Sequence, residues 1–302
     1  MATINGTTDN DTLTSLAAAD ILNGLEGDDT LYGGAGSDTL NGGDDDDVLA
    51  GGGEADVLNG GAGTDVADYS ASAAGVTVSL ASGTGSGGDA QGDTLTQVEN
   101  LVGSAQGDSL TGDGNANQLD GGAGADLLDG GAGIDTADYA TALMGVTVNM
   151  AFVSANTGDA VDDTFIAIES LSGSDFDDTL VGDGNANRLS GVEGNDTLNG
   201  MGGIDYLVGG AGDDVLAGGA GADVFVFNPG FGHDTITDFW AGPTRTDRVQ
   251  LIGTDLGNFT EVQTAFTQTV NGALLSMDGG AGTILFAGVA VSSFVADDFV
   301  FA

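Results

Sequence analysis

The chain has 302 residues, including 56 glycines and 47 acidic residues against three arginines and no lysine, and its formal net charge is −44. So much negative charge argues against nucleic acid and anionic membranes as partners and favours cations. There is no cysteine, which excludes disulfide bonds and thiolate metal sites. No apolar run approaches the length needed to cross a membrane.

The acidic residues are mostly aspartate and lie beside glycine, which suggests short carboxylates held by tight turns. An acidic, glycine-rich chain is also typical of disorder, and disorder is the alternative for the metal-free state. However, 40% of the residues are hydrophobic and regularly spaced, so we expect a folded state to exist.

From Gly6 the chain repeats every nine residues, as in GLEGDDTLY, GGAGSDTLN and GGDDDDVLA. The sixth position is Asp in every repeat of residues 6–68, and the eighth is almost always Leu. The period returns over 103–138 and 173–226. A longer repeat of 70 residues relates GGAGTDVADY at Gly60 to GGAGIDTADY at Gly130.

Each nonapeptide combines a turn with a short strand. Glycines at positions one, two and four permit positive φ and close backbone approach, so carbonyl oxygens can point inward. Positions seven to nine form a β-prone triplet with one apolar residue, which predicts a three-residue strand. Two such units complete a coil of eighteen residues, so loops eighteen residues apart should stack: Asp29 over Asp47, and Asp205 over Asp223.

Stacked carboxylates cannot all remain charged without a cation between them. Calcium prefers six to eight hard oxygen ligands, whereas magnesium demands stricter octahedral geometry, so the pattern predicts several Ca²⁺ ions as cofactors. One buried Leu per unit does not offset the ordering of nine residues, and the metal is therefore expected to be part of the fold.

The predicted metal ligands are of two kinds. The side-chain ligands are Asp29, Asp38, Asp47, Asp56, Asp65, Asp108, Asn117, Asp126, Asp135, Asp178, Asn187, Asp196, Asp205, Asp214, Asp223, Asp234 and Asp238. The backbone carbonyl ligands are those of Gly33, Gly36, Gly42, Gly121, Gly124, Gly130, Gly133, Gly191, Gly194, Gly200, Gly209, Gly212, Gly218 and Gly221. Asn replaces Asp at 117 and 187, so these two sites should be weaker.

The GGxGxD nonapeptides resemble those of the RTX (repeat-in-toxin, haemolysin-type calcium-binding) family. This resemblance implies an all-β, right-handed parallel β-roll with Ca²⁺ between stacked loops. It also implies a secreted protein of a Gram-negative bacterium, exported unfolded by type I secretion machinery. The ending ADDFVFA (296–302) is similar to the C-terminal signal of such proteins, and the N-terminus lacks the features of an ordinary secretory signal.

The repeats and the segments between them predict six parts of one all-β chain. Apolar alternation near the end favours an antiparallel sheet that closes the solenoid. Whether the inserts continue the coil remains open. The parts are a first repeat array (1–68), a β insert (69–102), a second array (103–138), a β insert duplicating the first (139–172), a third array (173–226) and a C-terminal β cap with the secretion signal (227–302).

No HExxH or GxSxG motif is present, and His233 is the only histidine, so we expect no enzyme. Two classes of function remain. In the first, the protein is itself an extracellular structural, surface-layer or matrix protein that self-assembles. In the second, it is a calcium-folded module that binds polysaccharide or aids the export or folding of an accompanying enzyme or toxin. The bare repeat array favours the first class.

Overall fold

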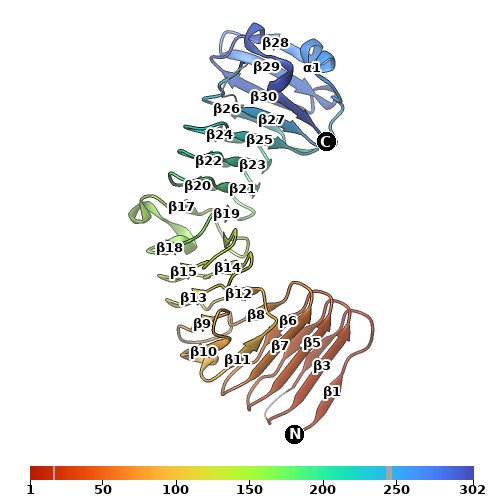
Figure 1. The fold of residues 1–302 in the computed structure, drawn as a ribbon, viewed down its shortest axis with the longest axis vertical. Coiled ribbons are helices and arrows are strands. Elements are labelled where there is room, and N and C mark those ends of the chain that lie inside the picture. The colour runs from red at the N-terminus through yellow and green to blue at the C-terminus, as the bar shows by residue number, and fades with distance from the viewer. Residues whose placement is uncertain (16–17, 243–246) are drawn as a thin grey trace. The chain divides into compact units, whose positions relative to one another are not determined.

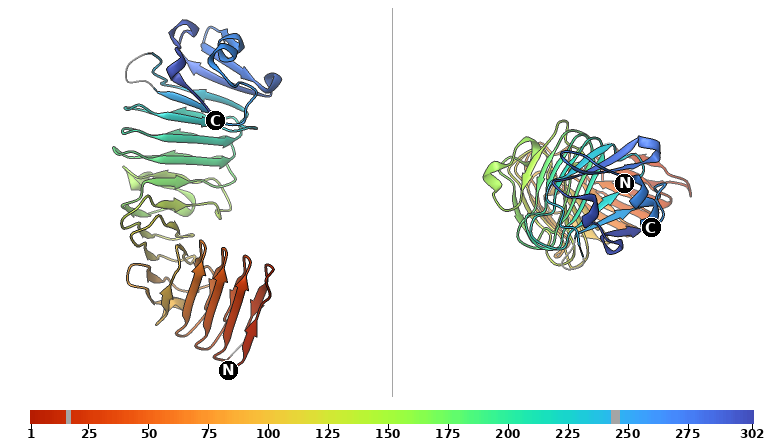
Figure 2. Two further views of the ribbon diagram at one scale, coloured as in Figure 1. Left: turned by 45° about the vertical axis from the view of Figure 1, so that its right-hand side comes forward. Right: turned by 90° about the horizontal axis from the view of Figure 1, so that it is seen from above.

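The computed structural model describes residues 1–15, 18–242 and 247–302. These residues form two compact units, each built of stacked β coils (Figures 1 and 2). Unit 1 contains residues 1–141 and 159–168, and unit 2 contains residues 142–158 and 169–302. None of the described helices is long and apolar enough to span a membrane.

In unit 1, successive strands of the arrays alternate between two sheets. The first sheet runs in the order β1 (Thr3–Asn5), β3 (Ile21–Glu26), β5 (Thr39–Asp44), β7 (Val57–Ala62), β11 (Thr94–Thr96), β10 (Thr84–Ser86), β9 (Thr77–Ser79), β13 (Ser109–Thr111), β15 (Leu127–Asp129) and β18 (Thr164–Ile166). The second runs in the order β2 (Thr12–Thr14), β4 (Thr30–Tyr32), β6 (Val48–Ala50), β8 (Val66–Asp68), β12 (Asn100–Val102), β14 (Gln118–Asp120) and β16 (Thr136–Asp138).

Unit 2 repeats this arrangement. One row of strands is β19 (Ser170–Ser172), β21 (Arg188–Glu193), β23 (Tyr206–Ala211), β25 (Val224–Phe227), β27 (Arg248–Leu251) and β31 (Phe299–Phe301). The other is β17 (Thr147–Asn149), β20 (Thr179–Val181), β22 (Thr197–Asn199), β24 (Val215–Ala217), β26 (His233–Ile236), β30 (Gly282–Ala287), β29 (Gly272–Met277) and β28 (Phe266–Gln268).

The helices are short and lie outside the repeat arrays. They are the α-helix α1 (Phe259–Ala265) and the 3₁₀ helices η1 (Gly88–Ala90), η2 (Val153–Ala155), η3 (Gly158–Ala160), η4 (Asp278–Gly280), η5 (Val291–Ser293) and η6 (Ala296–Asp298).

The strand register confirms the eighteen-residue coil. Leu22 pairs with Leu40 and Leu40 with Leu58 in one sheet, while Leu31 pairs with Leu49 in the other. All five side chains are fully buried, because only the middle residue of each triplet points into the roll. The sequence pattern of one apolar residue per nonapeptide is therefore the core of a parallel β-roll.

The inserts interrupt the stacking and then restore it. In the first insert, β11 pairs with β7 in parallel, β10 runs antiparallel to both β11 and β9, and β9 pairs with β13 in parallel. The second insert contributes β18 to unit 1, beside β15, and β17 to unit 2, beside β20. The inserts therefore continue the coil, with one antiparallel strand added in the first of them.

The C-terminal region combines continued coils with an antiparallel sheet. Strands β26, β27 and β31 extend the parallel rows, whereas β28, β29 and β30 pair antiparallel as the alternating apolar pattern predicts. The core here combines aliphatic side chains with a cluster of phenylalanines. Phe266 stacks on Phe294 with ring centroids 4.7 Å apart, and Phe239 packs edge-on against Phe286 at 5.0 Å.

Candidate calcium sites

The aspartates at position six lie in columns that follow the turns of the roll. Each lies directly before a strand triplet, at the point where the chain leaves the turn. Asp29, Asp38, Asp47 and Asp56 are each 1% exposed although they carry ionisable side chains. A buried carboxylate requires hydrogen-bond donors or a cation, so the partners of each oxygen determine what the turn can bind.

Within a column, one carboxylate oxygen of each later member accepts a hydrogen bond from the backbone N–H of the member before it. The N–H of Asp29 donates to Oδ1 of Asp47 (2.8 Å), and the N–H of Asp38 donates to Oδ1 of Asp56 (2.7 Å). These bonds link residues eighteen apart, on successive coils. The same bond joins Asp205 to Asp223 (2.9 Å) in unit 2, which confirms the predicted stacking of these two residues.

The columns extend beyond the predicted ligands. In unit 1 they are Asp11–Asp29–Asp47–Asp65–Glu99, Asp20–Asp38–Asp56–Asp93, Asp108–Asp126–Asp163 and Asn117–Asp135. In unit 2 they are Asp178–Asp196–Asp214–Asp234 and Asn187–Asp205–Asp223–Asp247.

Sequence reasoning missed Asp93, Asp163, Asp247 and Glu99 as column members. Asp93 and Asp163 are buried, and each precedes a triplet with an apolar central residue, TLT at 94–96 and TFI at 164–166. This is the sixth-to-eighth pattern of the nonapeptide without its glycine turn. The triplet was therefore the signal that could have identified them.

The second carboxylate oxygen, Oδ2, divides the turns into two kinds. In the first kind, which we call open turns, Oδ2 is buried and has no hydrogen-bond donor among the described residues. An anionic oxygen in this state is costly unless a cation binds it. The open turns end at Asp29, Asp38, Asp47, Asp56, Asp65, Asp126, Asp196, Asp205, Asp214 and Asp223.

The open oxygen faces a cradle beside the glycine at position one. A Cβ placed on Gly33 would lie 2.5 Å from the carbonyl oxygen of Gly51 and 2.8 Å from Oδ2 of Asp38. A carboxylate oxygen and a carbonyl oxygen of the next coil thus approach one point, which only glycine leaves free. Oxygen ligands of these two types are those that Ca²⁺ prefers. The residues present therefore fit calcium.

The carbonyls of most predicted position-one glycines occupy this place. Those of Gly42, Gly121, Gly130, Gly191, Gly200, Gly209 and Gly218 lie beside the position-one glycine of the preceding coil. Among the position-four glycines, the carbonyl of Gly194 lies against Gly212. For Gly33, Gly36, Gly124, Gly133, Gly212 and Gly221 no such position is seen, and the ligand roles of all the predicted glycines stay predictions.

The raised pKa values of the open-turn aspartates also indicate that a cation binds there. Burial, with repulsion from neighbouring carboxylates, raises the pKa of Asp47 and Asp56 to about 7 and that of Asp126 to about 8. In unit 2, the same causes raise the pKa of Asp196 and Asp205 to about 7. At neutral pH these carboxyls bind a proton or require a positive partner.

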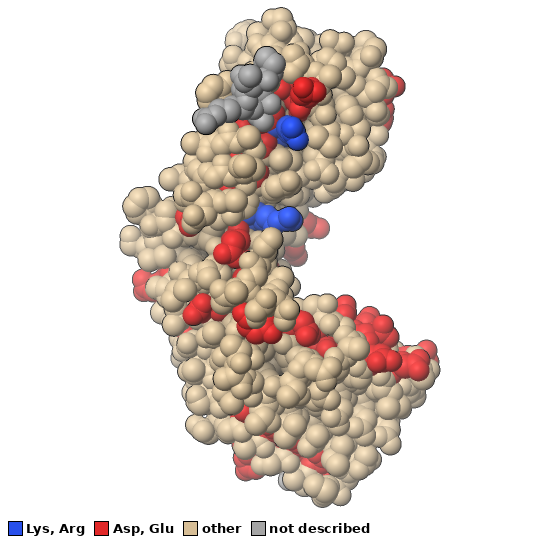
Figure 3. All heavy atoms as spheres, viewed as in Figure 1, with Lys and Arg blue, Asp and Glu red and all other residues tan. Residues whose placement is uncertain are grey.

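The candidate sites need backbone carbonyl oxygens as ligands, in addition to carboxylates. Within the described ranges, no three His, Asp or Glu side chains converge as a metal cluster. Each site must therefore combine one or two carboxylates with carbonyl oxygens of the turns. Figure 3 shows further acidic side chains in runs on the surface and very few basic ones, so the surrounding field also attracts cations.

In the second kind of turn, which we call capped turns, the second oxygen has a protein donor. Oδ2 of Asp108 accepts from the N–H (2.6 Å) and Oγ (3.2 Å) of Ser104. Oδ2 of Asp178 accepts from the N–H (2.6 Å) and Oγ (3.1 Å) of Ser174. Both aspartates were predicted ligands, and their geometry disfavours that role.

The two predicted asparagine ligands are capped in the same way. Oδ1 of Asn117 accepts from the N–H of Asp113 (2.7 Å), and Oδ1 of Asn187 accepts from the N–H of Asp183 (2.9 Å). Their Nδ2 groups donate to the carbonyls of Glu99 and Glu169, respectively. Both the oxygen and the nitrogen of each neutral amide thus have a backbone hydrogen-bond partner.

In the inserts, tyrosines act as the caps. The hydroxyl of Tyr69 donates to Oδ2 of Asp93 (3.1 Å), and that of Tyr139 donates to Oδ2 of Asp163 (2.8 Å). Both rings are almost fully buried. They therefore cover the roll next to the inserts, and each also supplies a hydrogen-bond donor.

The two predicted ligands in the C-terminal region differ from each other. Asp234 accepts from the N–H of Asp214 (2.9 Å) through Oδ1, and its buried Oδ2 has no donor in the described part of the chain. Asp238 accepts from the N–H groups of Gly218 (3.0 Å) and Gly219 (2.8 Å), one on each oxygen. The geometry favours Asp234 as a ligand and gives Asp238 a structural bond instead.

Parallel coils, glycine turns and cradles of carboxylate and carbonyl oxygens define the class of calcium-binding β-roll proteins. The sequence profile of the RTX calcium-binding nonapeptide repeat (4 copies) matches residues 3–31, 32–67, 102–137, 163–198, 190–225 and 199–236. These matches cover more than half of the chain, so the chain belongs to the RTX family and its repeats are calcium-binding repeats.

Two solved structures are similar to parts of this fold. The extracellular lipase LipA from Serratia marcescens is 21% identical with a TM-score of 0.38, over 98% of this chain and 39% of the lipase. The AlgE6R3 subunit from the Azotobacter vinelandii mannuronan C5-epimerase is 34% identical with a TM-score of 0.35, over 42% of this chain and 80% of the subunit. This chain thus spans well under half the length of the lipase. No curated protein matches the chain.

Proposed function

We propose that this protein is secreted, folds when it binds Ca²⁺ outside the cell, and acts there as a structural, surface-layer or matrix protein. The observation that carries the proposal is the series of buried Oδ2 atoms without donors in the open turns. Extracellular calcium modules bind at about 10⁻⁴–10⁻³ M, so a chain with such turns folds only where calcium is abundant. Calcium dependence would thus keep the chain unfolded until export.

Type I export is part of this proposal. It is supported by the ending ADDFVFA (296–302). In the folded protein this ending forms η6 and β31, where β31 pairs with β27. Deletion of about the last 60 residues should retain the chain inside a cell that has a type I exporter, and efficient export of the truncated chain would refute the assignment.

We assign no catalytic role. The sequence lacks HExxH and GxSxG, and the single histidine, His233, lies on the surface with Nδ1 3.1 Å from Oγ1 of Thr283. The repeats themselves make up most of the chain. A structural function then requires assembly. Sedimentation of the pure protein should show large species with calcium and none with chelator.

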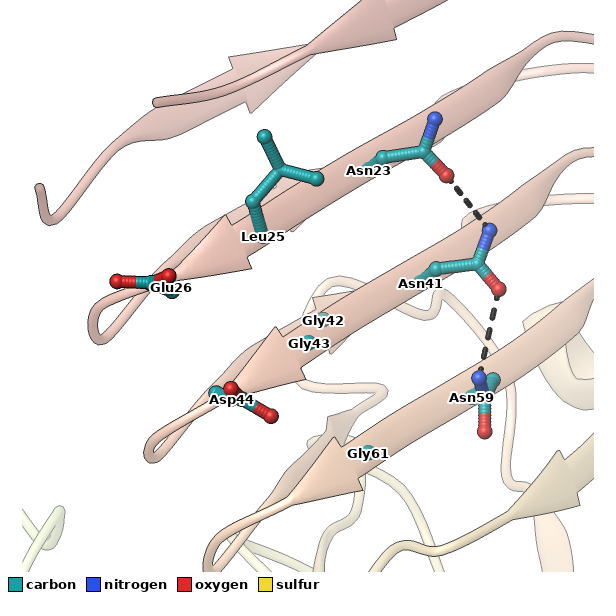
Figure 4. A pocket seen from close by; sticks show the side chains of 9 residues that line it. All are labelled: Asn23, Leu25, Glu26, Asn41, Gly42, Gly43, Asp44, Asn59 and Gly61. Atoms are coloured by element: carbon teal, nitrogen blue, oxygen red, sulfur yellow. Dashed lines mark hydrogen bonds between the residues drawn. The ribbon is translucent and has the colours of Figure 1, made fainter. Parts of the chain in front are cut away.

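A specific feature of unit 1 favours a second candidate function, the binding of polysaccharide. Asn23, Asn41 and Asn59 form a row along a shallow groove (Figure 4), which Leu25 and Gly43 also line. The Nδ2 of Asn41 donates to Oδ1 of Asn23 (2.9 Å), and the Nδ2 of Asn59 donates to Oδ1 of Asn41 (3.4 Å). Each amide keeps a further N–H and lone pair for ligand hydroxyls.

Asn41→Ala separates the two candidates. It removes the centre of the amide row without touching a carboxylate, so calcium-dependent folding and sedimentation should persist. Retention of the wild-type protein, but not of the variant, on an immobilised alginate-like or neutral polysaccharide would support the binding module. Asn10→Ala, at an exposed turn outside the groove, is the control. Calcium-dependent assembly with no polysaccharide retention supports the structural function.

A further inference from the structure

Open and capped turns differ at one backbone position, the second residue of the nonapeptide. In all ten open turns named above, this residue has a positive φ. The residues are Leu25, Gly34, Gly43, Gly52, Gly61, Gly122, Val192, Met201, Gly210 and Gly219, paired with Asp29, Asp38, Asp47, Asp56, Asp65, Asp126, Asp196, Asp205, Asp214 and Asp223.

Side-chain identity alone does not explain this correlation. Leu25, Val192 and Met201 have φ of 99°, 82° and 72°, in a region that disfavours residues with a Cβ and above all β-branched Val. The fold holds these three residues in a strained conformation. Such strain persists where the surrounding structure requires it, and it is frequent at binding sites.

In the five turns whose cap comes from the turn itself, position two lies outside the left-handed region. It is occupied by Thr7, Ser104, Asp113, Ser174 and Asp183. In each of them the N–H donates to a side-chain oxygen of position six, Oδ2 of an aspartate or Oδ1 of an asparagine, at distances of 2.6 to 2.9 Å. The same N–H in an open turn makes no such bond.

The φ of position two thus controls which partner the position-six oxygen has. Negative φ directs the N–H onto the carboxylate and supplies the donor from within the turn. Positive φ directs the N–H away and leaves a buried carboxylate oxygen beside the glycine cradle, where the turn supplies no donor and a cation can compensate the charge. The two conformations exclude each other, because one peptide group cannot point in both directions.

We infer that the conformation of position two selects the calcium sites: turns with positive φ bind Ca²⁺, and turns capped by their own position-two N–H fold without it. The inference rests on the proposed calcium-dependent folding. It places no ion at the turns of Asp108, Asn117, Asp178 and Asn187. Two of these metal-free turns follow the first insert along the chain and two follow the second, so each insert is followed by turns that need no ion.

The test compares Ser104→Gly with Ser104→Ala. Ala keeps negative φ and the N–H cap on Asp108, and it removes only the hydroxyl. Gly can adopt positive φ at no steric cost, so it releases the cap and frees Oδ2. Native mass spectrometry of the calcium-saturated full chain should show one additional ion for Ser104→Gly and none for Ser104→Ala.

A second pair of variants, in unit 2, tests the inference independently in case Ser104→Gly does not fold. Asn187→Asp alone adds a carboxylate but keeps the N–H cap from Asp183, so the number of bound ions should not change. The double variant Asp183→Gly/Asn187→Asp should bind one more ion. Complementary loss variants complete the set: Asp126→Asn should lower the number of bound ions, and Asp108→Asn should not.

The outcomes separate the inference from the proposed function. If the wild-type chain binds no calcium, the proposed function fails. If the wild type binds calcium but the Gly variants match their controls, or if Asp108→Asn loses an ion as Asp126→Asn does, the selection by position two is wrong and calcium-dependent folding still stands. An additional ion in the Gly variants alone supports the inference.

Discussion

Two neighbouring regions of unit 1 place aspartates in the same way and use them differently. In residues 21–68 the coils end in open turns, and each buried carboxylate keeps one oxygen without a donor. In residues 69–111 the carboxylates of Asp93 and Asp108 are equally buried, but Tyr69 and Ser104 donate to them. A buried aspartate of a column therefore need not be a metal ligand, because one protein donor, from the turn or from an insert, can replace the cation.

Removal of calcium should have the largest effect on this contrast. Without calcium, the open turns contain buried, mutually repelling carboxylates, so the array should lose its β structure cooperatively at neutral pH. Circular dichroism should show a largely disordered chain in chelator and a β-rich one at sub-millimolar to millimolar Ca²⁺. A β-rich spectrum unaffected by strong chelator would contradict the prediction.

Hydrogen exchange can compare the amide protection of the region with open turns with that of the region with capped turns. Amides of residues 30–65 should lose protection first as calcium is withdrawn. Those of residues 76–80 and 109–111, next to the capped turns, should lose it last. Equal loss in both regions would show that capping makes no energetic difference.

Substitution of open-turn aspartates should follow the column rather than the sequence order. Asp205 and Asp223 are linked by the stacking bond, so Asp205→Ala and Asp223→Ala should couple by about 1 kcal/mol or more in a double-mutant cycle. Asp205→Ala and Asp214→Ala lie in different columns and should be nearly additive. The measured quantity is the calcium midpoint of folding, and stronger coupling of the nine-apart pair would refute the two-unit coil.

Glycine substitutions test the close packing of the coils. Gly212 has φ of 143°, and a Cβ there would collide with the carbonyl oxygen of Gly194, so Gly212→Ala should destabilise unit 2 by about 1–3 kcal/mol. Gly184, also in a turn, would place its Cβ in open space. Gly184→Ala is therefore the matched control and should leave the calcium-loaded melting temperature nearly unchanged.

Acid should partly replace calcium in the open turns. Burial raises the pKa of Asp47 and Asp56 to about 7, against 3.8 for a free carboxyl. Between these values the metal-free folded state binds more protons than the unfolded state, so its stability falls as pH rises from about 4 to 7. In chelator, β structure should be greater at pH 5 than at pH 7.5, and no difference between them would contradict these shifts.

The smallest expected effect concerns the tyrosine cap. Tyr69→Phe keeps the buried ring and removes the donor to Oδ2 of Asp93, so we expect a loss of about 0.5–1.5 kcal/mol in stability. Exposed Tyr32 provides the control variant Tyr32→Phe. Thermal unfolding of both variants should show a lower midpoint for Tyr69→Phe only.

Much of the fold followed from the sequence alone, because its information is periodic. One apolar residue per nonapeptide fixes the face that is buried, and two nonapeptides complete a coil, so the strand pairing of Leu22, Leu40 and Leu58 was predictable. The sixth-position aspartates were predictable for the same reason. Local spacing and side-chain chemistry determine both features, without long-range contacts.

Only the tertiary structure showed the partners of each carboxylate oxygen. Asp93 joins the column of Asp56 across 37 residues, and Tyr69 reaches Asp93 across 24, so neither contact follows from the nine-residue period. The positive φ of Leu25, Val192 and Met201 could not be predicted from the sequence either, since residues with a Cβ intrinsically disfavour it. Hydrogen bonds depend on the direction of individual N–H groups, and the stacking of neighbouring coils sets that direction.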